Sequence, residues 1–257
     1  HKYSRGHAVV IGGDEMTGAA RLAAHAARRA GAGMLSIVST EITTSIYQQF
    51  EPGNVVLELL ENRDLSKILS DERRNAVLVG PGNGVTQMTR NNAITALKHQ
   101  KSVVLDADAL TIFGNDPQSL FSWIKGPCVL TPHQGEFARL FETNQDRLSN
   151  CRRASALAGS VVLLKGFDTV IADPGGRTAI NSNAPSDLAT AGTGDVLAGL
   201  IVGLLAQGMP PFEAACAGVW LHGEAGKLVG AGLIAEDLVE NLPNVLAELR
   251  KQTKSKE

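Results

Sequence analysis

A glycine-rich segment that ends in one carboxylate offers the clearest chemistry in this sequence. The stretch "AGTGDVLAG", residues 191–199, places Gly192, Gly194 and then Asp195 ahead of a long apolar run. Glycines let the main chain approach a phosphate closely, and the start of the following helix supplies unpaired N–H groups. Because a carboxylate beside such an anion cradle repels the anion, Asp195 is a candidate base for a hydroxyl proton. The alternative is that Asp195 only caps its helix.

Two further segments combine charged side chains with turn residues. "LKGFDT" (164–169) puts Lys165 at a strand end, where it could contact a diphosphate or remain a solvated lysine at a turn. "TPHQGE" (131–136) places His133 and Glu136 at the start of a helix, so both can face one cleft. There Glu136 could bind hydrated Mg²⁺ and His133 could hydrogen-bond a substrate. A capping box would use the same pair of residues for structure alone.

Other candidates are less specific. "GPGNG" (80–84) could approach a ligand with bare backbone, or simply turn the chain. Asp106 and Asp108 in "LDADAL" could be catalytic or could bind loop N–H groups. The histidines other than His133, among them His222, lack metal-ligand spacing, so we expect them to be structural.

The elements that must position these residues alternate between short apolar bursts and longer amphipathic segments. The bursts read as buried strands at 7–13, 34–40, 75–84, 102–110, 127–136 and 160–166. This alternation predicts an α/β fold with a parallel sheet covered on both faces. Residues 168–181 read as two strands around a Pro-Gly-Gly turn, a β-hairpin at the sheet edge, and the chain after 194 is mainly helical. Ligands of such sheets bind beyond the carboxyl ends of the strands, where the candidate residues lie.

Composition narrows the class of protein. A chain of 257 residues that is 44% hydrophobic predicts one domain, residues 1–250, followed by a flexible tail at 251–257. A net charge of -2 without a Lys/Arg block argues against nucleic acid and favours small-molecule partners. Three widely spaced cysteines suggest a reducing compartment. The longest apolar stretch is too short to span a bilayer, so we expect a cytoplasmic protein with no membrane partner.

The order of these motifs resembles one enzyme family. The chain is similar to the ADP-dependent NAD(P)H-hydrate dehydratases, a branch of the ribokinase-like superfamily, over nearly all of residues 1–240. The similarity rests on "VVIGGDEMTGAARLAAHAARRAGAG", "VGPGNG", "LDADAL", "LTPHQGEFARL", "LLKGFDTVI" and "DLATAGTGDVLAG". His133 stands where related sugar kinases usually carry the Asn of an N-x-x-E motif. The resemblance implies a ribokinase-like three-layer α/β/α sandwich with a mostly parallel central sheet and a β-hairpin edge.

The resemblance also implies a function. Members restore NADH or NADPH from the (6S)-hydrates, consuming ADP and releasing AMP and phosphate, with Mg²⁺ assisting. It further implies a homotetramer and, in many bacteria, fusion behind an epimerase domain. Two alternatives stay open at this point: an ATP-dependent kinase of a small hydroxymethyl metabolite on the same fold, and a nucleotide-binding module without catalysis.

Site residues follow from the matched motifs. The resemblance makes Asp195 the catalytic base and Glu136 a water-mediated contact to Mg²⁺. The residues that it assigns to the hydrated cofactor are Ala19, Gly82, His133 and Asp195. The residues that it assigns to ADP are Lys165, Gly166, Phe167, Asp168, Thr169, Ala191, Gly192, Thr193 and Gly194.

Overall fold

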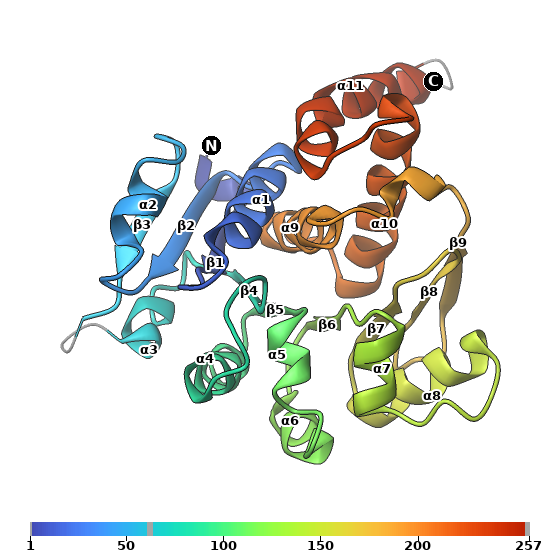
Figure 1. The fold of residues 1–257 in the computed structure, drawn as a ribbon, viewed down its shortest axis with the longest axis horizontal. Coiled ribbons are helices and arrows are strands. Elements are labelled where there is room, and N and C mark those ends of the chain that lie inside the picture. Colours follow the sequence, from blue (N-terminus) through green and yellow to red (C-terminus); the bar gives the residue numbers. More distant parts are fainter. Residues whose placement is uncertain (1, 61–63, 255–257) are drawn as a thin grey trace.

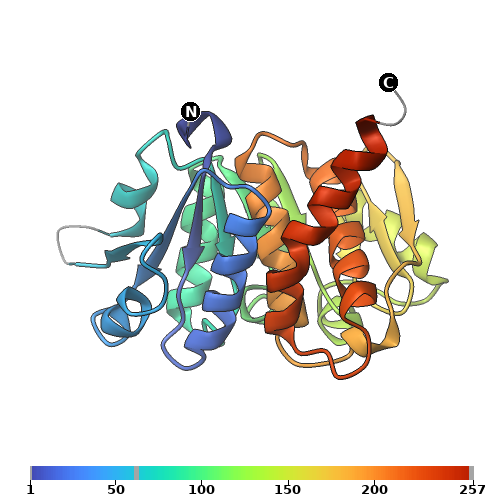
Figure 2. The ribbon, with the colours of Figure 1, turned by 90° about the horizontal axis from the view of Figure 1, so that it is seen from above.

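A nine-stranded sheet forms the middle layer of the computed structural model, which describes residues 2–60 and 64–254 (Figures 1 and 2). Its strand order is β3-β2-β1-β4-β5-β6-β7-β8-β9. Neighbours from β3 to β7 pair in parallel, whereas β8 pairs antiparallel with both β7 and β9. The strands are β1 His7–Ile11, β2 Met34–Ser39, β3 Val55–Glu58, β4 Ala76–Val79, β5 Ser102–Leu105, β6 Cys128–Leu130, β7 Val161–Leu164, β8 Thr169–Ala172 and β9 Thr178–Asn181.

Helices cover both faces of this sheet, as the three-layer prediction requires (Figure 1). One face carries α1 Thr17–Arg29, α2 Thr44–Gln48, α9 Thr193–Ala206, α10 Pro211–Val229 and α11 Ala235–Lys254. The opposite face carries α3 Leu65–Leu69, α4 Gln87–Lys98, α5 Asp108–Thr111, α6 Pro117–Trp123, α7 Gln134–Leu140 and α8 Arg147–Ala158. Two short 3₁₀ helices, η1 Lys2–Arg5 and η2 Ser186–Leu188, complete the set in the described residues.

The strands read as continuous apolar runs because both of their faces are buried. In β4, Ala76 and Leu78 belong to the core beneath α1 and α9, whereas Val77 and Val79 belong to the core on the other face. Every residue of this strand is buried. The sheet therefore needs two hydrophobic layers, which is the burial expected of parallel strands joined by helical crossovers.

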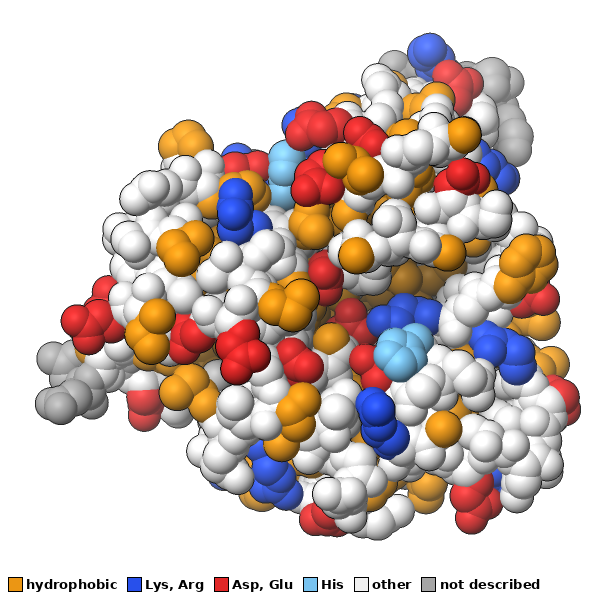
Figure 3. Space-filling view, in the orientation of Figure 1, with side chains coloured by type: hydrophobic (Ala, Val, Ile, Leu, Met, Phe, Trp, Pro, Cys, Tyr) orange, Lys and Arg blue, Asp and Glu red, His pale blue; other side chains and the backbone are white. Residues whose placement is uncertain are grey.

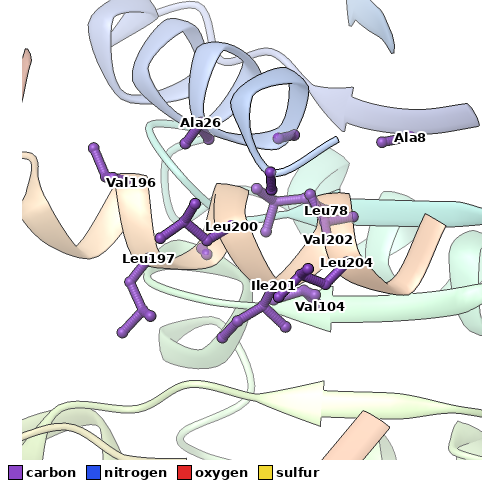
Figure 4. Packing of buried hydrophobic residues seen from close by; sticks show 14 of the residues in the cluster. Ala8, Ala26, Leu78, Val104, Val196, Leu197, Leu200, Ile201, Val202 and Leu204 are labelled. Carbon is purple, nitrogen blue, oxygen red and sulfur yellow. The ribbon is translucent and has the colours of Figure 1, made fainter. Parts of the chain in front are cut away.

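Helix α9 is the most deeply buried helix of its layer and connects the core to the functional edge. Its side chains pack on β4 and β5, and α1, which lies on β1 and β2, packs alongside it in the same layer (Figure 4). A Cβ on Gly199 or Gly203 would lie 2.2 or 2.5 Å from the carbonyl oxygens of Ala23 and Ala27 in α1. The small residues of α1 let it pack closely against α9 while it also lies on β1 and β2.

Two sequence-based expectations need correction at the edges of the fold. Strand β3 was not predicted; its half-exposed residues pair with β2 at the sheet edge. The flexible tail predicted at 251–257 is wrong for residues 251–254, because α11 continues through Lys254, and residues 255–257 lie outside the described part of the chain. The β-hairpin at 168–181 is confirmed as β8 and β9. Within residues 2–60 and 64–254, no helix has the length and apolar character to cross a membrane.

The turn after β4 depends on one glycine. Gly80 has φ +130°, and a Cβ there would lie 1.7 Å from the carbonyl oxygen of Asp106. We expect Gly80→Ala to lower the free energy of unfolding by about 3 kcal/mol or more, combining backbone strain with a clash against the backbone. Gly84→Ala is the matched control, since its φ of +74° is also left-handed but the nearest atom is 3.5 Å away. That control should lose about 1–2 kcal/mol in urea denaturation; equal losses would contradict the clash.

Candidate active site

The carboxyl ends of the parallel strands bring the charged candidates to one edge of the sheet. Asp106 follows β5, His133 follows β6 and Lys165 follows β7. Asp195 joins them from the first turn of α9 and lies close enough to Asp106 and Lys165 to interact electrostatically with both. Figure 3 shows acidic side chains, basic side chains and a histidine around a hollow near the centre of one face. Residues up to 89 positions apart in the sequence, as Asp106 and Asp195 are, therefore form one cluster.

Lys165 is a buried cation rather than a solvated lysine at a turn. Its Nζ lies 2.7 Å from Oδ1 of Asp106, and the two side chains are only 20% and 2% exposed. Burial lowers the pKa of Lys165, but Asp106 and then Glu136 outweigh this effect and raise its pKa. The ammonium group therefore stays charged in the fold, at a place where a phosphate could compete for it.

Asp195 occupies the third position of α9, and the hypothesis that it caps this helix is wrong. Gly192 is the N-cap residue, with φ +87°, and no side chain caps the helix. Among the described residues, none donates a hydrogen bond to the Asp195 carboxylate. Burial, and then the negative charge of Asp106, raise the pKa of Asp195 to about 7, although Lys165 lowers it. A carboxyl group with a pKa near neutrality is well suited to accept a proton in catalysis.

His133 and Glu136 form the capping box that the sequence left as an alternative. Nδ1 of His133 accepts the N–H groups of Gly135 and Glu136 at 2.9 and 3.3 Å, and Oε2 of Glu136 accepts the N–H of His133 at 2.9 Å. The cap does not withdraw His133 from the cleft, because its side chain remains 56% exposed. With Nδ1 accepting, the neutral ring carries its proton on Nε2 and presents a donor.

Glu136 by itself makes no magnesium site. It is 5% exposed, one of its oxygens is taken by the cap, and burial raises its pKa, with Lys165 lowering and Asp106 raising it further. Across residues 2–60 and 64–254, no group of three or more His, Cys, Asp or Glu side chains is placed to hold a metal ion. The residues therefore do not fit a Mg²⁺ ion bound by protein ligands alone, and phosphate oxygens would have to complete its shell.

A cavity of about 430 Å³ opens beside this charged cluster. Six of the residues assigned to ADP line it, whereas Asp168, Ala191 and Gly192 do not. Phe167 is 83% exposed, which leaves an aromatic ring at the cavity without a packing partner on most of its surface. The lining comprises Lys165, Gly166, Phe167, Thr169, Ala184, Pro185, Ser186, Leu188, Ala189, Thr193, Gly194, Leu197, Val219 and His222.

Sequence reasoning missed two parts of this cavity. The wall at 184–189 was assigned no ligand contact, since the side chains that line the cavity there are small or apolar: Ala184, Pro185, Ser186, Leu188 and Ala189. His222 of α10 is 8% exposed, and its Nε2 lies 2.9 Å from the carbonyl oxygen of Thr193. Burial lowers the pKa of His222 to about 4, so the neutral ring donates this hydrogen bond and holds the glycine-rich segment. Only the packing of α10 on α9 reveals this role.

Ala19 and Gly82 lie at the same edge of the sheet but outside that cavity. A Cβ on Gly82, which has φ +66°, would lie 2.2 Å from the carbonyl oxygen of Met16. Ala19 is 7% exposed, and its N–H donates to the same carbonyl oxygen at 3.2 Å. The structure thus places Gly82 against the loop before α1 and Ala19 in the first turn of that helix. Their contacts with a substrate stay predictions.

The loop after β4 and the aspartates of "LDADAL" divide between structure and chemistry. Asn83 turns the loop by accepting the N–H of Gly80 at 2.9 Å through its side-chain oxygen. Asp108 accepts the N–H of Gly84 at 2.8 Å, which is the structural alternative for that residue. Asp106 differs, because its carboxylate pairs with Lys165 within the cluster.

Comparison with known proteins identifies what this arrangement is similar to. Residues 8–244 match the family model described as NAD(P)H-hydrate dehydratase. A curated ADP-dependent (S)-NAD(P)H-hydrate dehydratase of Neisseria meningitidis is 37% identical over 256 residues, covering 93% of this chain and 84% of the relative. The chain also matches bifunctional NAD(P)H-hydrate repair enzymes, of whose length it spans about half.

Solved structures agree with this match. The ADP/ATP-dependent NAD(P)H-hydrate dehydratase from Bacillus subtilis, co-crystallised with ATP and Mg²⁺, superposes with a TM-score of 0.84 at 32% identity, covering 96% of this chain and 91% of that one. A ribokinase-like superfamily protein from Enterococcus faecalis gives a TM-score of 0.85 at 28% identity, covering 96% and 89%. The ribokinase-like three-layer fold expected from the sequence is confirmed.

Proposed function

Because the chain belongs to the NAD(P)H-hydrate dehydratase family, we propose that it restores NADH and NADPH from their (6S)-hydrates, with conversion of ADP to AMP and phosphate. One observation carries the proposal. Asp195 presents a carboxyl group of pKa about 7, with no hydrogen bond from the described residues, beside the start of α9 and the cation Lys165. That combination suits transfer of a phosphoryl group to a hydroxyl.

The proposed reaction has two stages. Asp195 takes the proton of the hydroxyl at C6 while that oxygen attacks the β-phosphorus of ADP, and AMP leaves. The C6–O bond then breaks, pushed by the lone pair of the ring nitrogen, and phosphate departs. Loss of a proton from C5 restores the ring double bond. Phosphorylation is needed because hydroxide is a poor leaving group, whereas phosphate leaves readily.

The cavity beside Lys165 is the proposed binding site of ADP. Its volume of about 430 Å³ and the exposed ring of Phe167 suit a nucleoside, since bases stack well on aromatic side chains. The phosphates then face Lys165 and the backbone N–H groups of Gly192, Thr193 and Gly194, which complement the developing charge. Thr169 lines the same cavity, and Asp168 and Ala191, which lie outside its lining, are proposed as further contacts along the two loops.

The hydrated nicotinamide is proposed to occupy the cleft on the other side of Asp195. We propose that Nε2 of His133, which lies 3.5 Å from Oε1 of Glu136, donates to it, and that the backbone near Ala19 and Gly82 contacts it as well. We propose that Mg²⁺ enters as a complex with ADP and that Glu136 faces its water shell. The Bacillus subtilis relative co-crystallised with ATP/Mg²⁺ supports a nucleotide–magnesium ligand for the family.

A reconstitution assay tests this function. Incubating the protein with hydrated NADH, Mg²⁺ and either ADP or ATP should return the absorbance of the reduced nicotinamide, with AMP formed from ADP. Recovery that requires the nucleotide supports the proposal. A stable phosphorylated product of a hydroxymethyl compound would instead favour a kinase, and tight nucleotide binding without turnover would favour a module without catalysis.

The pKa of Asp195 predicts the pH dependence of the reaction. Because the base must be ionised, kcat/KM should fall about tenfold per pH unit below pH 7, measured between pH 5.5 and 9. Asp106→Asn removes the negative charge that raises this pKa, so the acid limb should move to lower pH. Glu248→Gln, in an exposed pair with Lys251, is the matched control and should leave the limb in place. An unmoved limb in Asp106→Asn would contradict the assignment.

Three finer features belong to the same proposal. The bifunctional relatives, twice as long as this chain, support fusion to an N-terminal epimerase domain in the natural protein. A homotetramer is proposed from the family resemblance, and a cytoplasmic location from the three widely spaced cysteines and the short apolar stretches of the sequence. Sedimentation velocity on the purified protein tests the homotetramer, since a monomer would exclude it.

A further inference from the structure

Arg147, the first residue of α8, lies between the two loops that the proposed function assigns to different ligands. The loop at 164–168, after β7, carries Lys165 and Phe167 at the nucleotide cavity. Helix α7 begins with Gln134, between His133 and Glu136 of the capping box. These segments are not adjacent in the sequence, and Arg147 contacts both.

The guanidinium group of Arg147 divides its donors between them. Nη2 lies 3.2, 3.3 and 3.2 Å from the carbonyl oxygens of Leu164, Lys165 and Asp168. Nη1 donates to Oε1 of Gln134 at 2.9 Å. A single side chain thus gathers three carbonyl groups of the nucleotide loop and ties them to the start of α7.

Gly166 makes this approach possible. A Cβ at position 166 would lie 2.5 Å from Nη2 and 3.0 Å from Cζ of Arg147. The loop therefore closes around the guanidinium group only because its central residue has no side chain. The missing Cβ of Gly166 in "LKGFDT" makes room for Arg147.

Lysine cannot reproduce the arrangement. Arg presents donors on two nitrogens in a rigid plane, so one face holds the loop carbonyls while the other reaches Gln134. An ammonium group keeps the charge but offers one point of contact. Replacing Arg147 by lysine therefore keeps the positive charge and removes the geometry of the guanidinium group.

We propose that Arg147 is a positioning residue that sets the nucleotide loop at 164–168 and the start of α7 in one fixed relation. The inference rests on the proposed function, because it takes ADP as the ligand of the loop. Through the loop carbonyls, Arg147 fixes where Lys165 and Phe167 stand at the cavity. Through Gln134, it fixes the helix start that carries His133 on the substrate side.

Calorimetric binding of AMP and ADP to the intact protein, with steady-state kinetics, tests the proposal. Arg147→Lys should weaken AMP and ADP binding at least tenfold and raise the KM for ADP, with a smaller change in kcat. Gln134→Ala breaks only the α7 contact, so it should raise the KM for the hydrate while leaving AMP affinity within about twofold. Arg152→Lys, an exposed arginine of the same helix that contacts Thr178, is the matched control and should change neither.

The outcomes separate the inference from the function on which it rests. Wild-type protein that neither binds AMP nor restores NADH overturns the proposed function. Wild-type protein that does both, with wild-type AMP affinity in Arg147→Lys, overturns the role of Arg147. If Arg147→Lys fails to fold, Gly166→Ala tests the same contact from the other side, since its Cβ displaces the guanidinium group. Unchanged AMP affinity in that folded variant would also overturn the proposal.

Discussion

Replacing Asp195 by asparagine is expected to lower the rate of NADH recovery by about 10²- to 10⁴-fold, the usual contribution of a positioned base. The amide has nearly the size of the carboxylate but cannot accept the hydroxyl proton. Since none of the described residues donates a hydrogen bond to Asp195, the substitution breaks no hydrogen bond among them and changes only the charge beside Lys165 and Asp106. Single-turnover measurements with saturating ADP would isolate the chemical step, and wild-type turnover would exclude Asp195 as the base.

The stability of Asp195→Asn supplies the control, and its sign follows from the pKa. The pKa of Asp195 is about 7 in the fold, above its ordinary value of 3.8. The folded protein therefore holds this proton more tightly than the unfolded chain, and its stability falls as pH rises from about 4 to about 7. Asp195→Asn removes this cost, so its Tm should equal or exceed that of the wild type at pH 8 and match it near pH 4. A lower Tm at pH 8 would show a structural role.

Replacing Lys165 by methionine should have the largest combined effect on stability and ligand binding. Asp106 and Glu136 are 2% and 5% exposed, and Lys165 supplies the positive charge that offsets theirs. Removing one partner of a buried ion pair typically costs about 3–5 kcal/mol. We therefore expect Lys165→Met to lose about that much free energy of unfolding in urea at pH 8, and to lose measurable affinity for ADP.

A double variant separates these two losses. Lys165→Met combined with Asp106→Asn removes both charges of the pair that is in direct contact, so part of the stability should return, while the buried Glu136 still lacks its cation. Affinity for ADP should stay low in the double variant, since the cation is still missing. Lys227→Met, in an exposed pair with Glu224, is the surface control and should cost about 0–1 kcal/mol. Wild-type affinity for ADP in Lys165→Met would contradict the assignment of Lys165 to the nucleotide-binding site.

These charges explain why the site costs stability. Asp195 carries no hydrogen bond from the described residues, and its pKa is raised because the side chain is partly withdrawn from water and Asp106 repels its negative charge. The same features that destabilise the carboxylate make it a stronger proton acceptor near neutral pH. Variants that neutralise Asp195 are therefore expected to gain stability at high pH and to lose activity, a common exchange at active sites.

Local sequence was sufficient for most of the fold. The strands of the parallel sheet are predictable because burial on two faces demands unbroken apolar runs, and the Pro-Gly-Gly turn predicts the hairpin of β8 and β9. The sequence also predicts that the candidate residues lie at one edge of the sheet, because the carboxyl ends of parallel strands meet there. Strand β3 escaped because its half-exposed residues carry too weak a hydrophobic pattern. The extent of α11 escaped because its last turn is polar.

Tertiary structure alone decided how the site residues are used. Residue types and their spacing identified Asp195, Lys165, His133 and Glu136 as candidates. The same local pattern, however, was compatible with Asp195 as a helix cap and with Asp195 as a catalytic base. The choice depends on contacts between distant segments: the pair of Lys165 with Asp106, 59 residues apart, and the buried setting that raises the pKa of Asp195. The pairing of these charged side chains and their withdrawal from water arise only when distant strands and helices pack, so the local sequence around each residue does not indicate them.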